Sequence, residues 1–540
     1  MRFRQTVLAV PFLALPFTAA LAEYCTDQPN LALINGNIYT MDDADSRVSS
    51  VFIREGVFVA LNDDDYSEQD CTEVIDLQGR TVIPGLIDNH VHFVRIQNRP
   101  GHDTREIEST FSVEEVLAVI AEKTQSVTDG DLITAIGGFR QWQWAEGRFP
   151  TITELDSVAP NNPVYLSEHG FGPGQVNSAG RDLLRSLGVN IGNDGSVAAR
   201  EDTALAYEML AAELNDEHRK RQLEDLIAWA NKIGLTAAMD MSGTVPGVGF
   251  LDQTVGYEPI VSLDRNNELN LRTRLYLPAL DEDAELGQLQ GRLDNTFHNF
   301  GSDMLKVVGV GEWSVGRSLF NSQPLGNAAV DAQWRMAERG WTYHQHLHSP
   351  AEIDAHLDVW ESIDPTYDLS ELRWTAGHMS GATPELIDRV IDLGLGIGAH
   401  GQPYSQRGNG GPPWRTIVES DVVAKAAGSD GARISPFNPW SIIYYMVTGK
   451  NSAGEEVNLD QTVSRYDAIK LYSSADQGWF TKEEGKLGGI DIGRYADVVV
   501  LSADVFDETA VPDEQLRQMT SSLTIVGGKV VYSDGSLTTP

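Results

Sequence analysis

The stretch from Val82 to His92 holds the residues best suited to chemistry, because an apolar run ends there in two histidines one residue apart. Side chains alternate along a strand, so His90 and His92 would face the same way at its carboxyl end. A neutral imidazole is the commonest metal ligand in proteins, and two on one face supply half of a site. The sequence therefore predicts a buried strand that presents two metal ligands.

Further candidate ligands end or follow apolar runs elsewhere in the chain. Each has an ordinary structural alternative, since an aspartate at a strand end often caps the next helix and a lone histidine is often structural. Their joint placement is what suggests a metal centre for hydrolysis, with an acid/base beside the bound water. These candidates are Lys306, the run His344 to His348, His378 and Asp430.

Eight apolar runs, separated by amphipathic helical stretches, supply the strands that would position these residues. Such alternation predicts parallel α/β architecture, and eight units fit a (β/α)₈ barrel whose active site lies where the strands end. The runs are Thr81 to His92, Leu235 to Met241, Leu271 to Leu277, Met304 to Val310, Trp341 to His346, Arg373 to His378, Leu395 to His400 and Ala426 to Asp430.

Both ends of the chain show short alternating runs around glycine turns, which are typical of hairpin strands. We expect residues 23–81 and 485–540 to form one small β-sandwich beside a barrel of residues 82–484. The long excursion 93–234 after the first barrel strand would be an inserted lid or substrate-shaping region. By position, the candidate substrate contacts are Trp142, His169, Asn177 and Arg433, and each has a structural alternative.

Residues 1–22 indicate a secretory signal peptide, because Arg2 and Arg4 precede an apolar run that ends in a small-x-small site. Cleavage is expected before Glu23, which places the mature protein in the periplasm or outside the cell; a retained signal anchor is the alternative. Cys25 and Cys71 would then meet an oxidising compartment and could pair, or remain two free thiols.

The composition, with 41% hydrophobic and 22% charged residues, is that of a soluble globular protein. A formal net charge of −38 disfavours nucleic-acid and anionic-membrane partners. We therefore expect a small-molecule substrate, no nucleic acid and, after signal cleavage, no membrane partner. A homo-oligomer is compatible with the sequence.

These stretches resemble the amidohydrolase superfamily, and specifically its amidohydrolase-3 branch of N-substituted formamide deformylases and YtcJ-like proteins. The resemblance runs from near Leu31 to Tyr532, so it spans nearly the whole mature chain. The Pro-Gly-x-Ile-Asp-x-His-x-His signature is its most specific part. The matching stretches are Pro84 to His92, Pro150 to Leu166, Val176 to Ser178, Gly428 to Asp430 and Gly493 to Leu501.

The resemblance implies hydrolysis of a non-peptide C–N bond, in an amide, formamide or cyclic amide, by a metal-activated water. Asp430 would be the general base and then the general acid. One or two divalent metal ions, usually zinc, are implied as cofactors. The implied ligands are His90, His92 and Asp430 on one ion, His346 and His378 on the other, and Lys306 as a bridging N6-carboxylysine. His346 is preferred to His344, which shares its strand parity, because Gly340-Trp341 matches the start of the family's fifth strand.

Three positions depart from the family pattern. The lysine strand lacks the usual aspartate before Glu312, Gly377 stands where the family has a glutamate before its sixth-strand histidine, and Ser349-Pro350 replaces a Gly-Asp pair. These departures motivate one alternative, a barrel without turnover that acts as a periplasmic binding or sensing protein. A hydrolase of esters or lactones on the same fold is the other alternative.

Overall fold

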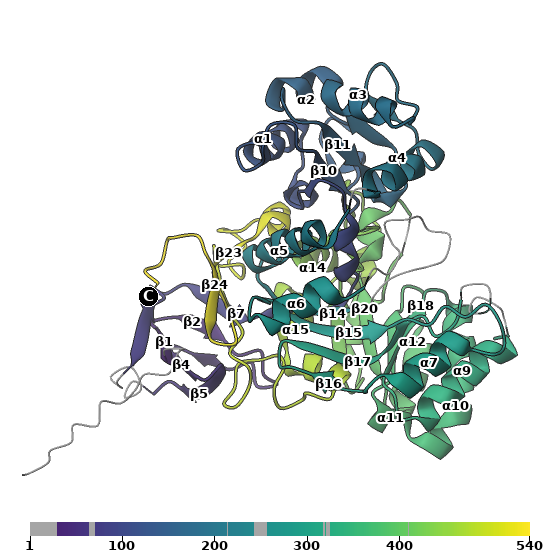
Figure 1. Ribbon diagram of the computed structural model, residues 1–540. Coiled ribbons are helices and arrows are strands. Elements are labelled where there is room, and N and C mark those ends of the chain that lie inside the picture. Colours follow the sequence, from purple (N-terminus) through teal and green to yellow (C-terminus); the bar gives the residue numbers. More distant parts are fainter. Residues whose placement is uncertain are drawn as a thin grey trace, which may run out of the picture.

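The structure of this chain is a computed structural model that describes residues 30–63, 71–212, 214–241, 256–316, 319, 324–408, 410–431 and 433–539, without the side chain of His169 (Figure 1). The expected signal peptide and Cys25 lie outside the described residues, so cleavage and the pairing of Cys25 with Cys71 stay predictions. Within the described part, no helix is both long enough and apolar enough to cross a bilayer.

The centre of the molecule is a parallel sheet whose strands, within the described residues, follow the order β8-β14-β15-β17-β18-β19-β20-β21. These strands are almost wholly buried, as expected where helices cover the outside of a sheet and side chains fill its inside. Their bounds are β8 (Leu86–Val91), β14 (Leu235–Asp240), β15 (Arg272–Leu277), β17 (Leu305–Glu312), β18 (Tyr343–Leu347), β19 (Thr375–His378), β20 (Gly396–His400) and β21 (Lys425–Gly428).

Backbone hydrogen bonds just beyond β21 and β8 bring the two ends of this sheet together. The amide of Asp430 donates to the carbonyl of His90 at 2.8 Å, and the amide of His92 donates to the carbonyl of Gly431 at 2.8 Å. The described strands therefore form a near-closed (β/α)₈ barrel, which confirms the predicted fold class. Closure also fixes the position of Asp430 relative to the two histidines.

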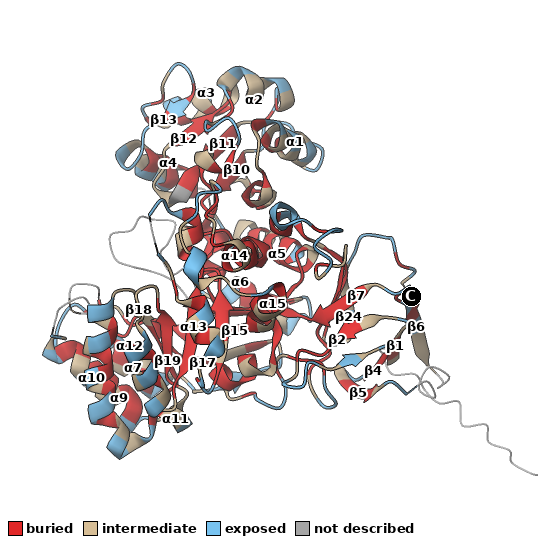
Figure 2. Cartoon of the chain, turned by 180° about the vertical axis from the view of Figure 1, so that it is seen from behind, coloured by how far each residue is buried: buried red, intermediate tan, exposed pale blue. Residues whose placement is uncertain are grey.

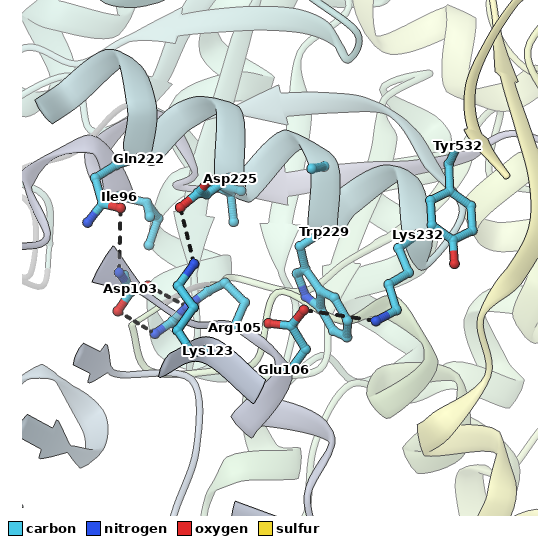
Figure 3. Close-up of a pocket in the computed structure, with 12 residues that line it drawn as sticks. Ile96, Asp103, Arg105, Glu106, Lys123, Gln222, Asp225, Trp229, Lys232 and Tyr532 are labelled. Carbon is cyan, nitrogen blue, oxygen red and sulfur yellow. Dashed lines mark hydrogen bonds and ion pairs between the residues drawn. The ribbon is translucent and has the colours of Figure 1, made fainter. Parts of the chain in front are cut away.

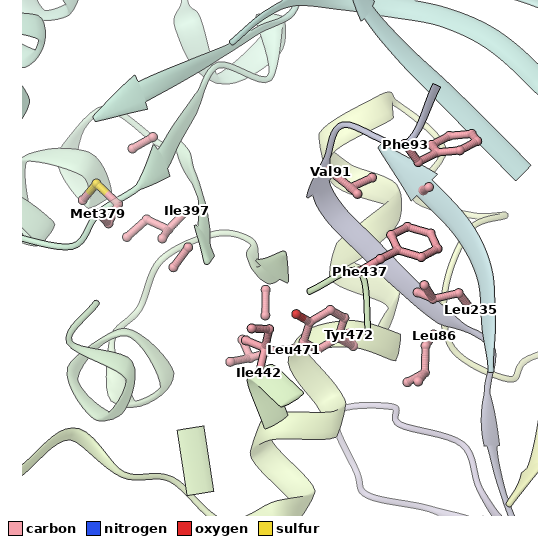
Figure 4. Packing of buried hydrophobic residues seen from close by; sticks show 14 of the residues in the cluster. Leu86, Val91, Phe93, Leu235, Met379, Ile397, Phe437, Ile442, Leu471 and Tyr472 are labelled. Atoms are coloured by element: carbon pink, nitrogen blue, oxygen red, sulfur yellow. The ribbon is translucent and has the colours of Figure 1, made fainter. Parts of the chain in front are cut away.

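Helices surround the barrel, and buried residues run along the barrel strands and the inner sides of the helices (Figure 2). Part of this core is shown in Figure 4, where Val91 and Phe93 lie near Phe437. The helices are α5 (Asp216–Lys232), α6 (Glu258–Arg265), α7 (Gly287–Asn295), α9 (Asn327–Glu338), α10 (Pro350–Tyr367), α11 (Leu369–Leu372), α12 (Pro384–Asp392), α13 (Trp414–Glu419), α14 (Pro439–Thr448) and α15 (Arg465–Ser473).

The run Thr81 to His92, expected to be one strand, is two strands. β7 (Thr81–Pro84) pairs with β2 (Asn37–Tyr39) and β22 (Val498–Leu501) in the small domain, whereas β8 pairs with β14 in the barrel. Gly85 joins them at a point where an added Cβ would lie 2.0 Å from the Thr236 hydroxyl. Only glycine allows the chain to change sheets this close to β14.

Strands from both ends of the chain build the small domain. Its two sheets have the orders β5-β4-β1-β6 and β24-β23-β22-β7-β2-β3. Buried residues from both ends, among them Leu33, Ile53, Val500 and Ile525, form one apolar cluster. The remaining strands are β1 (Asn30–Ile34), β3 (Arg47–Val48), β4 (Val51–Arg54), β5 (Val57–Leu61), β6 (Thr72–Asp76), β23 (Ser521–Val526) and β24 (Lys529–Ser533).

The chain between β8 and α5 forms a separate α/β unit that projects from the barrel (Figure 1). Its sheet has the order β13-β12-β11-β10-β9, and Ile133, Trp144 and Leu166 belong to its own apolar core. Thr151 and Glu154 form a capping box at the start of α2. The elements are β9 (His102–Asp103), α1 (Val113–Thr124), β10 (Ile133–Ile136), α2 (Ile152–Val158), β11 (Val164–Ser167), β12 (Gly174–Val176), α3 (Ser178–Ser186), β13 (Ser196–Val197) and α4 (Glu201–Ala211).

A buried ion pair ties the small domain to the barrel. Arg272 on β15 donates from Nε to Asp497 Oδ2 at 2.7 Å and from Nη2 to Oδ1 at 3.1 Å. The side chains are only 3% and 9% exposed, so water screens this pair weakly. Removal of one partner therefore leaves the other as a buried, uncompensated charge.

We expect Asp497→Asn to lower the free energy of unfolding by about 3–5 kcal/mol, because Arg272 then lacks its counter-charge. Asp294→Asn is the matched control, since Asp294 pairs with Arg339 at the surface; it should change the stability far less, because water and salt screen an exposed pair. Urea unfolding followed by circular dichroism measures both losses. Equal losses would contradict the bridging role of Asp497.

Candidate metal centre

Ligand-type side chains meet at the carboxyl ends of the barrel strands. Six of the eight barrel strands in the described part of the chain contribute at least one of them. They are His90 and His92 at the end of β8, Glu312 at the end of β17, His344, His346 and His348 on or just after β18, His378 ending β19, His400 ending β20, and Asp430 just after β21.

The carboxylate of Glu312 lies at the centre of this group. His346 Nδ1 is 2.6 Å and His378 Nε2 is 3.1 Å from its Oε2. Two further imidazoles approach it, with His90 Nε2 at 3.4 Å from Oε2 and His92 Nε2 at 3.3 Å from Oε1. Burial raises the pKa of Glu312, but the contacts from His346, His378 and His90 outweigh it and hold the pKa well below its usual value. Glu312 is therefore anionic.

Asp430 completes this carboxylate-rich side of the centre. Its Oδ1 lies 3.3 Å from His92 Nε2. Burial and the charge of Arg95 lower the pKa of His92, but contacts with Asp430 and Glu312 overcome both and raise it to about 9. The two carboxylates thus concentrate negative charge at His92, which is the electrostatic condition that also favours a cation there.

The other side of the centre is made of histidines. The ring centroids of His378 and His400 lie 3.4 Å apart, and those of His346 and His378 lie 3.8 Å apart. Burial lowers the pKa of His348 to about 4 and holds the pKa values of His378 and His400 well below the usual range. These rings are therefore neutral, which is the form that binds metals.

Several buried nitrogens in this group have no hydrogen-bond partner within the described part of the chain. They include Nδ1 of His378, both ring nitrogens of His400, Nε2 of His90 and Nδ1 of His344. Buried polar atoms are normally satisfied, and a metal ion would satisfy such nitrogens. The donor set, with neutral imidazoles and two carboxylates, fits a divalent cation such as zinc.

The ligand atoms fall into three groups of metal-binding size. Among the residues that the structure describes, the ligand atoms within each group lie within 4.8 Å of one another. The groups are His90, His92 and Glu312; His346, His348 and His378; and His90, His378 and His400.

Two ligand-type residues lie on left-handed backbone. His378 has φ 64° and Asp430 has φ 54°. A non-glycine residue in this region costs about 1–3 kcal/mol and is typical of functional sites, where the geometry of a side chain matters more than local stability. The left-handed backbone sets the direction in which these two side chains leave the ends of β19 and β21.

The structure does not bring Lys306 to this centre, so its expected role as a bridging carboxylysine is corrected. Lys306 is the second residue of β17, and its Nζ lies 2.7 Å from Glu483 Oε1, a carboxylate that also pairs with Arg274. Glu312 lies six positions further along the strand, at a distance of about 20 Å. Glu312, at the other end of the same strand, occupies the place expected for the lysine.

Sequence reasoning missed two members of the centre, namely Glu312 and His400, and it named His348 only as part of the candidate run His344 to His348. Their signals were present, because His400 ends one of the eight apolar runs and His348 has the strand parity of His346. Glu312 follows directly on the apolar part of β17. The structure brings His90, His92, His346, His378 and Asp430 together, as the sequence suggested.

Asn177 is not a substrate contact but a structural residue of the inserted unit. Its Oδ1 accepts from the amides of Gly180 and Val164 at 2.8 and 2.9 Å, and its Nδ2 donates to the carbonyls of Ala159 and Asn162. The side chain is fully buried and caps α3. The side chain of His169 lies outside the described part, so its role stays a prediction.

Arg433 and Trp142 lie where the inserted unit meets the barrel loops. The carbonyl of Arg433 accepts from the amide of Gly138 at 3.1 Å, and its guanidinium lies 4.3 Å from the ring centre of Phe171. Trp142 Nε1 donates to the hydroxyl of Ser452 at 3.3 Å. Both residues join the two units, and contact with a substrate stays a prediction.

A crevice of about 290 Å³ lies between the inserted unit, α5 and β24 (Figure 3). Its charged side chains pair with one another on two sides of Trp229: Lys123 with Asp225 at 3.4 Å, and Lys232 with Glu106 at 3.9 Å. No ligand-type residue of the metal centre lines it. These pairs hold the inserted unit against the barrel helix.

Known proteins resemble this chain over most of its length. An N-substituted formamide deformylase of Arthrobacter pascens is 23% identical over an alignment of 556 residues, gaps included, that covers 94% of this chain and 99% of that protein. Putative amidohydrolase YtcJ of Bacillus subtilis (strain 168) is 24% identical over 545 residues, covering 92% and 98%.

Solved structures share the fold. An uncharacterized metal-dependent hydrolase from Pyrococcus furiosus superposes with a TM-score of 0.58 at 20% identity, covering 88% of this chain and all of that one. Atrazine chlorohydrolase TrzN from Arthrobacter aurescens TC1, in complex with zinc, superposes with a TM-score of 0.54 at 13% identity, covering 93% and 95%.

The family assignment rests on the chain as a whole. The model of the amidohydrolase family matches residues 73–532, which include the C-terminal strands of the small domain, the inserted unit and every ligand-type residue of the centre. This chain belongs to the amidohydrolase family.

Proposed function

We propose that the protein is a metal-dependent hydrolase that cleaves a C–N bond other than a peptide bond, in an amide, formamide or cyclic amide. The observation that carries the proposal is the buried centre at the mouth of the barrel, where imidazoles from four strands surround Glu312 and Asp430. The named activity of the Arthrobacter pascens relative supports the choice of bond. Zinc suits the nitrogen and oxygen donors.

The residues fall into two sets of ligands. His90, His92, Glu312 and Asp430 would hold one cation beside the carboxylates, and His346, His348 and His378 would hold a cation among the imidazoles. When bound, a divalent cation supplies a Lewis acid that polarises a carbonyl and makes water nucleophilic near neutral pH.

Asp430 is the residue proposed to move the proton. Its carboxylate lies beside His92 at the barrel mouth, on the strained backbone that follows β21. It would accept a proton from the attacking water and pass it to the leaving nitrogen as the C–N bond breaks, so the products are a carboxylic acid and an amine. General acid/base catalysis of this kind contributes about 10²- to 10⁴-fold to the rate.

The inserted unit is proposed to shape the substrate pocket, because Arg433 and Trp142 lie where it meets the loops of the barrel. Loops at the carboxyl ends of barrel strands carry specificity in this fold. The partner is therefore a small molecule, and the signal-like segment of residues 1–22 supports export to the periplasm or the medium.

Removal of metal should abolish turnover. The zinc-loaded protein is expected to release amine from at least one member of a panel of N-substituted formamides, cyclic amides and simple amides. Dialysis against a chelator should stop this release, and added zinc should restore it, because the ligand set cannot by itself make water nucleophilic. If the protein hydrolyses esters or lactones but none of the C–N substrates, the assignment of the bond is wrong. If the zinc-loaded protein turns over no substrate at all, the proposed hydrolase activity is wrong.

Asp430→Asn should separate proton transfer from metal binding. The amide retains an oxygen that can ligate but cannot accept the proton, so turnover should fall by about 10²- to 10⁴-fold while zinc content is kept. His92→Ala is the comparison, and it should lose zinc itself. Amine release and elemental analysis measure the two effects; an Asp430→Asn protein with full zinc and wild-type turnover would remove Asp430 from the mechanism.

A pair of variants on β17 tests whether Glu312, and not Lys306, is the metal ligand on this strand. Glu312→Gln should lower zinc stoichiometry, because it removes the anionic group that contacts four histidines in the described structure. Lys306→Met should keep the wild-type stoichiometry, since Lys306 pairs with Glu483 away from the centre. Elemental analysis of dialysed protein gives the result, and the opposite pattern would restore the lysine as a ligand.

A further inference from the structure

We propose that His344 is a positioning residue that orients His90 for metal binding. The inference rests on the proposed function, because it concerns how one ligand of that centre is held. Among the described residues, His344 belongs to none of the three groups of metal-binding size, although it lies next to them on β18.

Geometry links the two rings directly. His344 is completely buried, and its Nε2 lies 3.1 Å from Nδ1 of His90. The other nitrogen of His90, Nε2, faces Glu312 at 3.4 Å. One side of the His90 ring is thus turned to the centre and the other side to His344.

The direction of this hydrogen bond decides whether His90 can bind a cation. A neutral imidazole has one nitrogen that donates and one that accepts. If His90 donates from Nδ1 to Nε2 of His344, the lone pair on its own Nε2 is free to bind. If His344 were the donor, His90 would carry its proton on Nε2 and could not bind through it. A ligating His90 therefore requires His344 as the acceptor.

Two glycines make room for the His344 ring. An added Cβ at Gly377 on β19 would lie 2.6 Å from His344 Nε2, and one at Gly398 on β20 would lie 2.8 Å from its Cε1. Any other residue at either position would displace the ring from His90. Gly377 is also the position where the family pattern has glutamate. A glutamate there would collide with the His344 ring, so the glycine is needed for His344 to lie beside His90.

The competing roles for His344 predict different outcomes. A ring that only fills space could be replaced by phenylalanine without effect on metal binding. A direct ligand would lower zinc stoichiometry when removed. A positioning residue changes affinity at constant stoichiometry, and glutamine, whose side-chain oxygen can accept near the position of Nε2, should replace it.

The test measures zinc affinity by competition with a chromophoric chelator, using the full-length protein. We expect His344→Phe to bind zinc about 10- to 100-fold more weakly at unchanged saturating stoichiometry, as is typical when an outer partner of a ligand is lost. His344→Gln should stay close to wild type. His356→Phe is the matched control, because His356 is equally buried but contacts Gln333 outside the centre; melting temperatures show whether each variant folds.

Wild-type affinity in a folded His344→Phe protein, or a lower saturating stoichiometry, would overturn this role. A crystal structure of the zinc-loaded wild type adds a check that needs no variant, since zinc on Nδ1 of His90 instead of Nε2 would also overturn it. If the wild-type protein binds no zinc or other divalent cation, the proposed function fails and the role of His344 fails with it. If the wild type binds zinc and only the His344 results disagree, the proposed function stands.

Discussion

The buried carboxylate of Glu312 is the group on which the rest of the centre depends. Nitrogens of four histidines from three strands lie within 3.4 Å of its oxygens in the described structure. A buried charge costs several kcal/mol unless partners of good geometry surround it. The imidazoles provide those partners, but they also crowd one another, and nitrogens of His378 and His400 lack hydrogen bonds within the described part. Glu312 therefore holds the histidines together but does not provide a hydrogen-bond partner for every ring nitrogen. This is expected of a site that binds a cation.

The barrel backbone sets the geometry around that carboxylate. Hydrogen bonds between the segments that follow β21 and β8 hold Asp430 beside His90 and His92, so the closing edge of the sheet is also part of the centre. Beneath the ligands, the side chain of Asp88 accepts from the amide and hydroxyl of Ser429, and burial raises its pKa to about 7. A change in strand register would move several ligands at once.

The sequence predicted the parts of this architecture that rest on local pattern. His90, His92, His378 and Asp430 were found because each stands at the end of an apolar run. The role expected for Lys306 comes from the family resemblance and is wrong, because Lys306 stands near the start of β17 and the strand continues to Glu312 at its carboxyl end. A lysine near the start of a barrel strand and a glutamate at its end lie at opposite ends of the barrel. The local sequence pattern does not show which end of the strand faces the centre. Asn177 was misjudged because its four partners are brought together only by tertiary folding.

The small domain has a consequence for how the protein is made. β7 is synthesised early but must pair with β22, which lies more than four hundred residues later in the chain. The ribosome delivers β22, β23 and β24 last, so the apolar residues Val82 and Ile83 have no sheet partner on that side until translation is almost complete. Completion of the sandwich is thus a late event in biogenesis, and a polypeptide truncated before Val498 would keep an unpaired, aggregation-prone edge directly next to the first barrel strand.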